Sequence, residues 1–147
     1  MYGLLLFLHI LAATIWTGGH IVLSTVILPK VLKAKSVKML IDFESVYEKI
    51  GMPALVIQIV TGLFLIHRMQ PDFVAWFDTS SAYSHPILAK LTLLTLTFCF
   101  ALNARFRVIP KLSTETLNIM AVHIIAVTLL SILFVFVGVS FRTGWLY

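Results

Sequence analysis

Five histidines stand out in a chain that is otherwise poor in charge. His9, His20 and His123 fall within long apolar stretches, while His67 and His85 lie at the ends of such stretches. An ionisable side chain in an apolar helix is costly to keep and usually serves a function, although a lone histidine can also simply hydrogen-bond a neighbouring helix. Imidazole is a ligand for haem iron and for copper. The five side chains are therefore candidate metal ligands, and the elements that carry them decide which of them can meet.

The composition excludes a water-soluble globule. Of the 147 residues, 60% are hydrophobic and 12% are charged, and the mean hydropathy is about +1. Soluble domains carry roughly 25% charged residues, about twice the share found here. The formal net charge of +5 would indicate a nucleic-acid partner only if the basic residues formed one patch on a soluble surface. A single cysteine permits no intrachain disulfide.

Windows without charge predict four transmembrane helices. Residues 1–29, 50–67 and 116–141 contain no Asp, Glu, Lys or Arg, and Lys90 alone interrupts a fourth window at 85–103. A helix needs about 20 apolar residues to cross the hydrocarbon core, and a lysine near its end can reach the interface. We expect an all-α fold, an integral membrane four-helix bundle that forms one domain over residues 1–147. The predicted spans are about 3–28, 48–67, 85–105 and 117–141.

The distribution of basic residues predicts the orientation of the bundle. Cytoplasmic connections carry an excess of Lys and Arg. Eight of the 11 basic residues fall in the first connection, between Lys30 and Lys49, or in the third: Lys30, Lys33, Lys35, Lys38, Lys49, Arg105, Arg107 and Lys111. Both termini are then expected on the outer, periplasmic side of a bacterial inner membrane. The positive charge is a topology signal, so the expected partner is the lipid bilayer and no nucleic acid.

His9 and His20 are expected on one face of the first span at two depths. They are 11 residues apart, which corresponds to about 16.5 Å of rise and to three turns plus about 20°. Trp16 lies between them on that face and would separate the two levels, and small residues such as Ala13 and Gly19 leave room beside the helix.

The remaining histidines complete an inner and an outer layer. His123 in the fourth span matches the depth of His20, and the two form the inner layer. The outer layer holds His9, His67, His85 and Lys90. His9 therefore has two candidate partners, His67 and His85, and both alternatives stay open. His67 and His85 can also reach the interface, where they need no partner.

Two histidines from facing helices at one depth suit haem b. Its iron takes axial imidazoles, and its flat apolar ring fits between the helices of a bundle. Basic residues such as Arg68 and Lys90 could pair with the propionates. We expect one or two haems and a b-type cytochrome that moves electrons between a quinone or periplasmic donor and an acceptor on the other side. An oxidoreductase activity and a homodimer are compatible with this reading.

Copper is the alternative cofactor or cargo, because imidazole and thioether both suit that metal. His67, Met69 and His85 would meet at the outer mouth. The methionines are scattered, which favours a packing role, and Gln58 in mid-membrane needs a partner, for which an interhelical hydrogen bond is favoured over a quinone or substrate cavity. The alternative function is copper transport or resistance.

The run LHILAATIWTGG at residues 8–19 resembles the first helix of the copper resistance protein D (CopD) family. It also resembles the HemJ-type protoporphyrinogen oxidases, small four-helix haem b proteins, in which a first-helix His is followed seven residues later by Trp and then by Gly. Further similarities are the Leu28-Pro29-Lys30 step and the Ala89-Lys90-Leu91 opening of the third helix.

These resemblances cover most of the chain in helix order and loop size. The HemJ-type resemblance implies that His9 ligates haem, that Lys90 lies at or near it, and that porphyrinogen oxidation is a second alternative function. That pattern usually has a His two residues before the Lys, where this chain has Leu88, and it has no counterpart of His20 or His123. The departures favour a two-haem relative within the CopD-like group.

Overall fold

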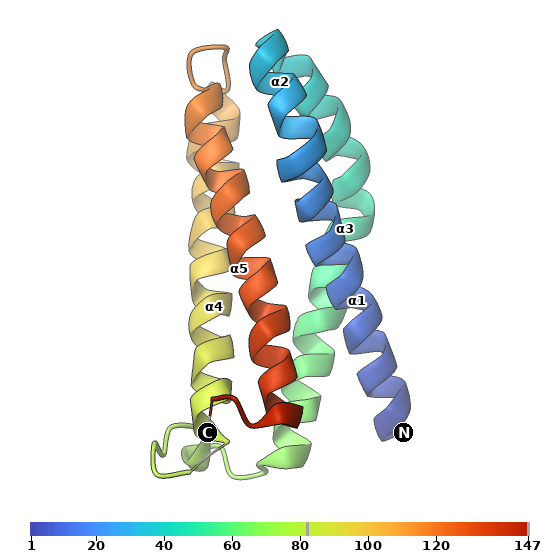
Figure 1. Cartoon of the computed structure of the whole chain (residues 1–147), viewed down its shortest axis with the longest axis vertical. Helices are drawn as coiled ribbons and strands as arrows, with labels where there is room; N and C mark the ends of the chain where they lie inside the picture. The colour runs from blue at the N-terminus through green and yellow to red at the C-terminus, as the bar shows by residue number, and fades with distance from the viewer. Residues whose placement is uncertain (82, 147) are drawn as a thin grey trace.

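Long helices make up nearly the whole of the computed structural model, which describes residues 1–81 and 83–146 (Figure 1). In chain order the elements are α1 (Tyr2–Val22), the π-helical η1 (Leu23–Ile27), α2 (Leu28–Ala34), α3 (Val37–Met69), the 3₁₀ turn η2 (Val74–Trp76), α4 (Ser84–Asn103), the π-helical η3 (Ala104–Val108), the 3₁₀ turn η4 (Ile109–Lys111) and α5 (Leu117–Thr143). The described residues contain no strand, so the predicted all-α fold is confirmed.

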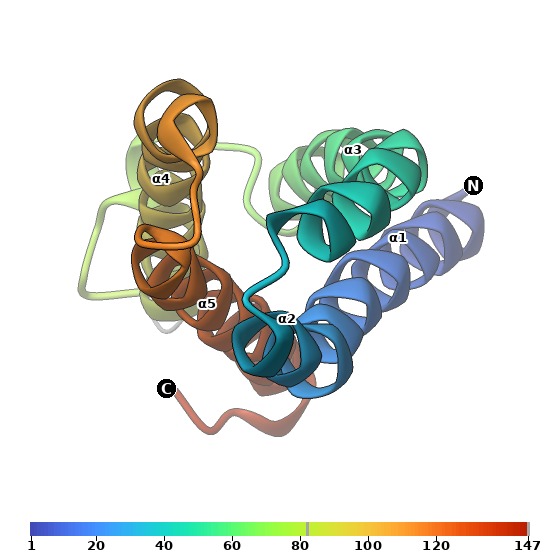
Figure 2. The same cartoon turned by 90° about the horizontal axis from the view of Figure 1, so that it is seen from above.

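The helices form an up-and-down bundle of two pairs. α1 packs along α3, α4 packs along α5, and the pairs meet mainly through α1 and α5. Seen from above, the order around the bundle is α4, α5, α1 and α3 (Figure 2). Both ends of the chain lie at one end of the bundle with the loop between α3 and α4, while the α2–α3 turn and the α4–α5 connection lie at the other (Figure 1). This order fits the predicted topology, and the side that faces the cytoplasm stays a prediction from the basic residues.

The outer surface of the bundle is apolar. Among the described residues, four helical segments are long and apolar enough to cross a membrane: Tyr2–Ala34, Val37–Met69, Ser84–Lys111 and Leu117–Thr143. Large side chains such as Phe7, Phe64 and Phe106 are exposed on them. In a bilayer such side chains contact the apolar acyl chains, and each helix satisfies the hydrogen bonds of its own backbone. The protein is therefore a multi-pass membrane protein.

The helices continue beyond the windows that lack charge. The segment 30–49, expected as the first connection, is helical except at Lys35 and Ser36. Lys35 ends α2 with a left-handed φ of 48°, and the Ser36 hydroxyl accepts a hydrogen bond from the Met39 amide at 3.2 Å and caps α3. Lysine is a good helix former. Its charges therefore end the apolar window but do not end the helix.

Two prolines explain the two π-helical turns. Pro29 and Pro110 are each the second residue after a π-helical turn, η1 and η3 respectively. A proline ring clashes with the carbonyl four residues earlier, which belongs to Thr25 in η1 and to Phe106 in η3. The wider i→i+5 turn moves that carbonyl aside. The helical segment therefore runs past Pro29 to Ala34, and the segment that begins with α4 extends to Lys111.

Tyr47 on α3 fits a slot that two glycines provide. A Cβ atom added to Gly19 of α1 would overlap the Tyr47 ring, and one added to Gly51 of α3 would lie 2.9 Å from its Cζ. The Tyr47 hydroxyl donates to the backbone carbonyl of Trp16 at 2.9 Å. The ring thus fills the room beside Gly19 and ties α3 to the backbone of α1.

Gly19→Ala tests this contact. We expect a loss of about 1–3 kcal/mol in the free energy of unfolding, because the new methyl group must displace the Tyr47 ring. Thermal unfolding in detergent measures the change. Gly18→Ala is the matched control, since nothing lies within 4 Å of a Cβ at that position, and it should leave the stability unchanged or raise it. Equal melting temperatures for the two variants would contradict the contact.

Candidate functional site

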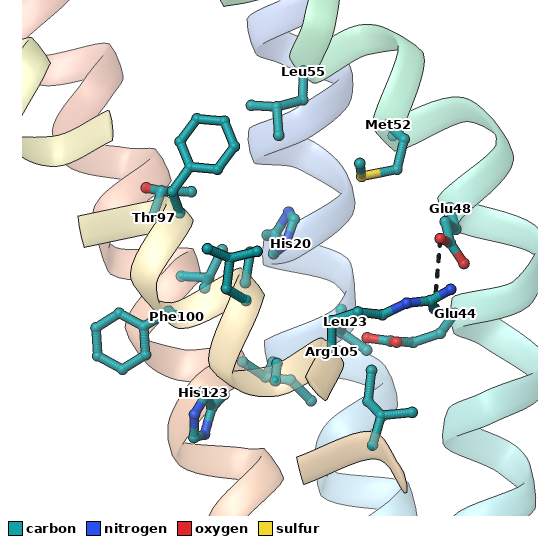
Figure 3. Close-up of a pocket in the computed structure, with 18 of the residues that line it drawn as sticks. His20, Leu23, Glu44, Glu48, Met52, Leu55, Thr97, Phe100, Arg105 and His123 are labelled. Atoms are coloured by element: carbon teal, nitrogen blue, oxygen red, sulfur yellow. Dashed lines mark ion pairs between the residues drawn. The ribbon is translucent and has the colours of Figure 1, made fainter. Parts of the chain in front are cut away.

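A cavity of about 370 Å³ opens between α3 and α4, nearer the end of the bundle that carries α2. His20 of α1 and His123 of α5 line it from the back, and α3 and α4 contribute mostly apolar side chains such as Leu55 and Phe100 (Figure 3). The cavity therefore contains both histidines of the predicted inner layer.

His20 is held in an orientation suited to metal binding. It is 9% exposed, its ring centroid lies 4.3 Å from that of Trp16, and its Nδ1 lies 2.9 Å from the Trp16 carbonyl oxygen. A neutral imidazole that donates from Nδ1 keeps the lone pair on Nε2. Metal-binding histidines usually have their other ring nitrogen fixed in this way. Within the described residues no hydrogen bond occupies Nε2 of His20.

His123 differs from His20 because both of its ring nitrogens have partners. Nδ1 lies 2.9 Å from the Ile119 carbonyl oxygen, and Nε2 lies 3.0 Å from the side-chain amide of Asn103. When Nδ1–H donates to Ile119, Nε2 accepts, so the Asn103 amide must present its NH₂ group; which amide atom is oxygen is assigned from such bonds. A metal at His123 would therefore have to displace Asn103.

Two thioethers line the same cavity as the two histidines. Met120 of α5 is 3% exposed, and Met52 of α3 is exposed. The scatter of methionines along the sequence favoured a packing role, and the fold brings these two to one cavity. No group of three or more His, Cys, Asp or Glu that could hold a metal occurs in the described part of the chain. Imidazole and thioether groups are therefore the ligands available away from the carboxyl groups of Glu44 and Glu48, which also line this cavity.

Carboxyl groups and a guanidinium line the mouth of the large cavity. Arg105 Nη1 lies 3.8 Å from Glu48 Oε1, which links η3 to α3 (Figure 3), and Glu44 lies beside this pair. Both partners are more than half exposed. An exposed pair of this kind contributes about 0–1 kcal/mol to stability.

A second cavity, of about 60 Å³, lies on the other side of Trp16. His9, Gln58 and Lys90 line it together with apolar side chains. Trp16, Leu55 and Leu94 line both cavities. These three side chains form the border that we call the Trp16 partition; that Trp16 separates two cofactor levels stays a prediction.

The hydrogen bonds of His9 define its free nitrogen. Nδ1 lies 3.0 Å from the Thr61 hydroxyl oxygen, and that hydroxyl donates to the Ile57 carbonyl at 2.6 Å. Because the hydroxyl hydrogen is used, Thr61 accepts from Nδ1–H of His9, and the lone pair remains on Nε2. His9 therefore has the same tautomer as His20.

Apart from Lys90, the side chains predicted near the outer surface as haem or copper partners do not share a cavity with His9. His67, Arg68 and His85 are exposed and line neither cavity, and the Arg68 guanidinium lies 5.9 Å from the Tyr2 ring centroid. Helical phase is the reason. His67 follows Gly62, which contacts His9, by five residues, and His85 precedes Lys90 by five. Five residues turn a helix by about 140° from the facing position.

The two-haem arrangement expected from the sequence finds no support in these cavities. Tyr47 fills the room beside Gly19, and Asn103 occupies Nε2 of His123. The outer cavity has a volume of about 60 Å³. In other proteins, a cavity of about 150 Å³ accommodates a molecule the size of benzene. A porphyrin ring needs far more space than this outer cavity provides.

Sequence reasoning missed Tyr47 and the Asn103–His123 bond. A signal for Tyr47 existed, because Tyr47 and Gly51 are one turn apart and Gly19 offers a facing gap. Nothing in the sequence indicated which residue on another helix Asn103 would meet.

Comparison with known proteins identifies the family. Residues 42–141 match a family model described as Copper resistance protein D. Searches among curated proteins and among solved structures gave no match. The matched segment contains the α3, α4 and α5 walls of both cavities. Because it covers more than half of the 147 residues, the chain belongs to the Copper resistance protein D family.

Proposed function

We propose that this protein binds copper ions as cargo in the large cavity and acts in copper transport or resistance in a bacterial inner membrane. The observation that carries the proposal is the position of His20, whose free Nε2 belongs to a cavity that Met52 and Met120 also line. The family to which the chain belongs supports the same reading.

The chemistry of the available ligands favours Cu(I). Thioethers are soft ligands that select Cu(I), and imidazole also suits copper. A set made of His20, Met52 and Met120 is uncharged, which limits how tightly it holds a cation. A transported ion must bind well enough to enter and weakly enough to leave. The carboxyl groups of Glu44 and Glu48 at the mouth offer a first contact for a cation.

The predicted orientation assigns the two ends of the bundle to the two sides of the membrane. It puts the mouth at Arg105 near the cytoplasmic surface and the exposed side chains of His67, Met69 and His85 at the outer surface. These outer side chains line neither cavity, so the proposed copper site does not depend on them.

The first prediction concerns Cu(I) affinity. We expect His20→Ala to weaken binding by about tenfold or more, since one lost ligand bond of about 1.4 kcal/mol has that effect. The double variant Met52→Leu/Met120→Leu should act in the same direction and nearly preserves volume. Competition of the purified protein with a chromogenic Cu(I) chelator measures the change.

Met39→Leu is the matched control for this experiment. Met39 is exposed and lines neither cavity, so its replacement should leave Cu(I) affinity unchanged. Thermal unfolding of each variant reports whether it is folded. If folded His20→Ala protein binds Cu(I) as the parent does, copper does not bind at this site.

A b-type cytochrome is the second candidate, and the free Nε2 of His20 beside a largely apolar cavity favours it. His20 would supply one axial ligand, and the haem would supply electron transfer. Arrangements with a quinone, a redox partner or an oxidoreductase activity depend on this candidate. The expected result is a reduced-minus-oxidised difference spectrum of haem b that His20→Ala abolishes. Purified protein without haem b absorption, expressed with ample haem, would exclude it.

Porphyrinogen oxidation rests on a different pair, His9 and Lys90, which share the small cavity. Complementation of a strain that lacks this step tests the activity. We expect growth to depend on both side chains if the protein supplies the step. A well-expressed protein that does not restore growth would rule out this function.

A further inference from the structure

One buried side-chain atom has no hydrogen-bond partner within the described residues, and it is Oε1 of Gln58. Gln58 is 8% exposed and lines the small cavity behind the Trp16 partition. Buried polar atoms nearly always have a partner, either from the protein or from an ordered water molecule. This oxygen therefore indicates a ligand inside the cavity.

Lys90 brings an ammonium group to the same cavity. The described residues offer it neither an ion pair nor a hydrogen bond. Its Nζ lies 5.7 Å from the centroid of the Phe141 ring and passes within van der Waals distance of Gly138. A cation over an aromatic face is attracted to it, but that contact uses none of the three N–H donors in a hydrogen bond.

His9 supplies the third group, because its Nδ1–H donates to Thr61 and its Nε2 keeps a lone pair. The cavity thus combines two acceptors, on Gln58 and His9, with the donors of Lys90. These groups do not bond one another directly. A ligand that satisfies all of them must both donate and accept hydrogen bonds within about 60 Å³.

We propose that the small cavity is a binding site for internal water, which bridges Gln58, Lys90 and His9 within the membrane. Water donates to the two acceptors and accepts from the ammonium. A cavity needs only about 10–15 Å³ of accessible space to hold one water molecule, so water fits. A metal cation would meet the ammonium charge, and an anion would leave the lone pair of His9 without a donor. Trp16, Leu55 and Leu94 line both cavities, and none of the three proposed water partners lines the large one, so the water site does not depend on copper binding.

Radiolytic labelling tests the proposal, because X-rays produce hydroxyl radicals from trapped water and these mark adjacent side chains for mass spectrometry. Ile66 lines the cavity and is 8% exposed, and Leu130 is equally buried but lines neither cavity. In the full-length protein without chloride, we expect labelling at Ile66 several-fold above that at Leu130. Equal labelling of the two would overturn the proposal.

Variants of the polar side chains supply the second arm. Gln58→Leu removes one bridge and fills part of the cavity, so labelling at Ile66 should fall to the level of Leu130. Lys90→Met keeps the length of the side chain and should lower the labelling as well. If both folded variants label Ile66 as the parent does, these residues do not hold the water. A fall in parental labelling on addition of chloride would assign the site to an anion and overturn the water assignment.

Discussion

Tyr47 joins α3 to α1 through both its ring and its hydroxyl group. The ring occupies the slot between Gly19 and Gly51, and the hydroxyl bonds the Trp16 carbonyl. The same carbonyl accepts from Nδ1 of His20, and the Tyr47 ring packs edge-on against the imidazole at 5.6 Å. One aromatic side chain thus sets the spacing of two helices and the orientation of the histidine on which the proposed copper site depends. The large cavity exists because α3 is held against α1 and stays apart from α4.

Most small polar side chains in the bundle bond a carbonyl of their own helix. Thr97 donates to Leu93, and Ser140 donates to Val137. Such local bonds satisfy the hydroxyls without requiring a partner from another helix. Polar side-chain atoms that have no hydrogen-bond partner are therefore informative. Nε2 of His20 and Oε1 of Gln58 have no protein partner in the described chain, and each lines a cavity. Both proposed ligands, copper and water, follow from these unfilled positions.

The sequence predicted what depends on period and composition. It located four apolar helices, put His9 and His20 on one face, and matched His123 to the depth of His20, because rise and rotation per residue are fixed. It did not predict the partner of Asn103 or the presence of Met52 and Met120 in one cavity, because these depend on how helices rotate against one another. It also paired His9 with His67 or His85 by depth alone, whereas the fold gives His9 a cavity shared with Lys90. Depth can be read from one helix, but facing direction requires two.

The helices of the first pair are long for a membrane. Tyr2–Ala34 and Val37–Met69 each comprise 33 residues, or about 50 Å of helix against a hydrocarbon core of about 30 Å. Tilt absorbs only part of this excess. We therefore expect the lysine-rich ends of the pair to extend beyond the lipid as a short stalk, with Glu44 and Glu48 on its lower part. An ion could then pass between the large cavity and the aqueous phase at the headgroup level, without a route through the acyl chains.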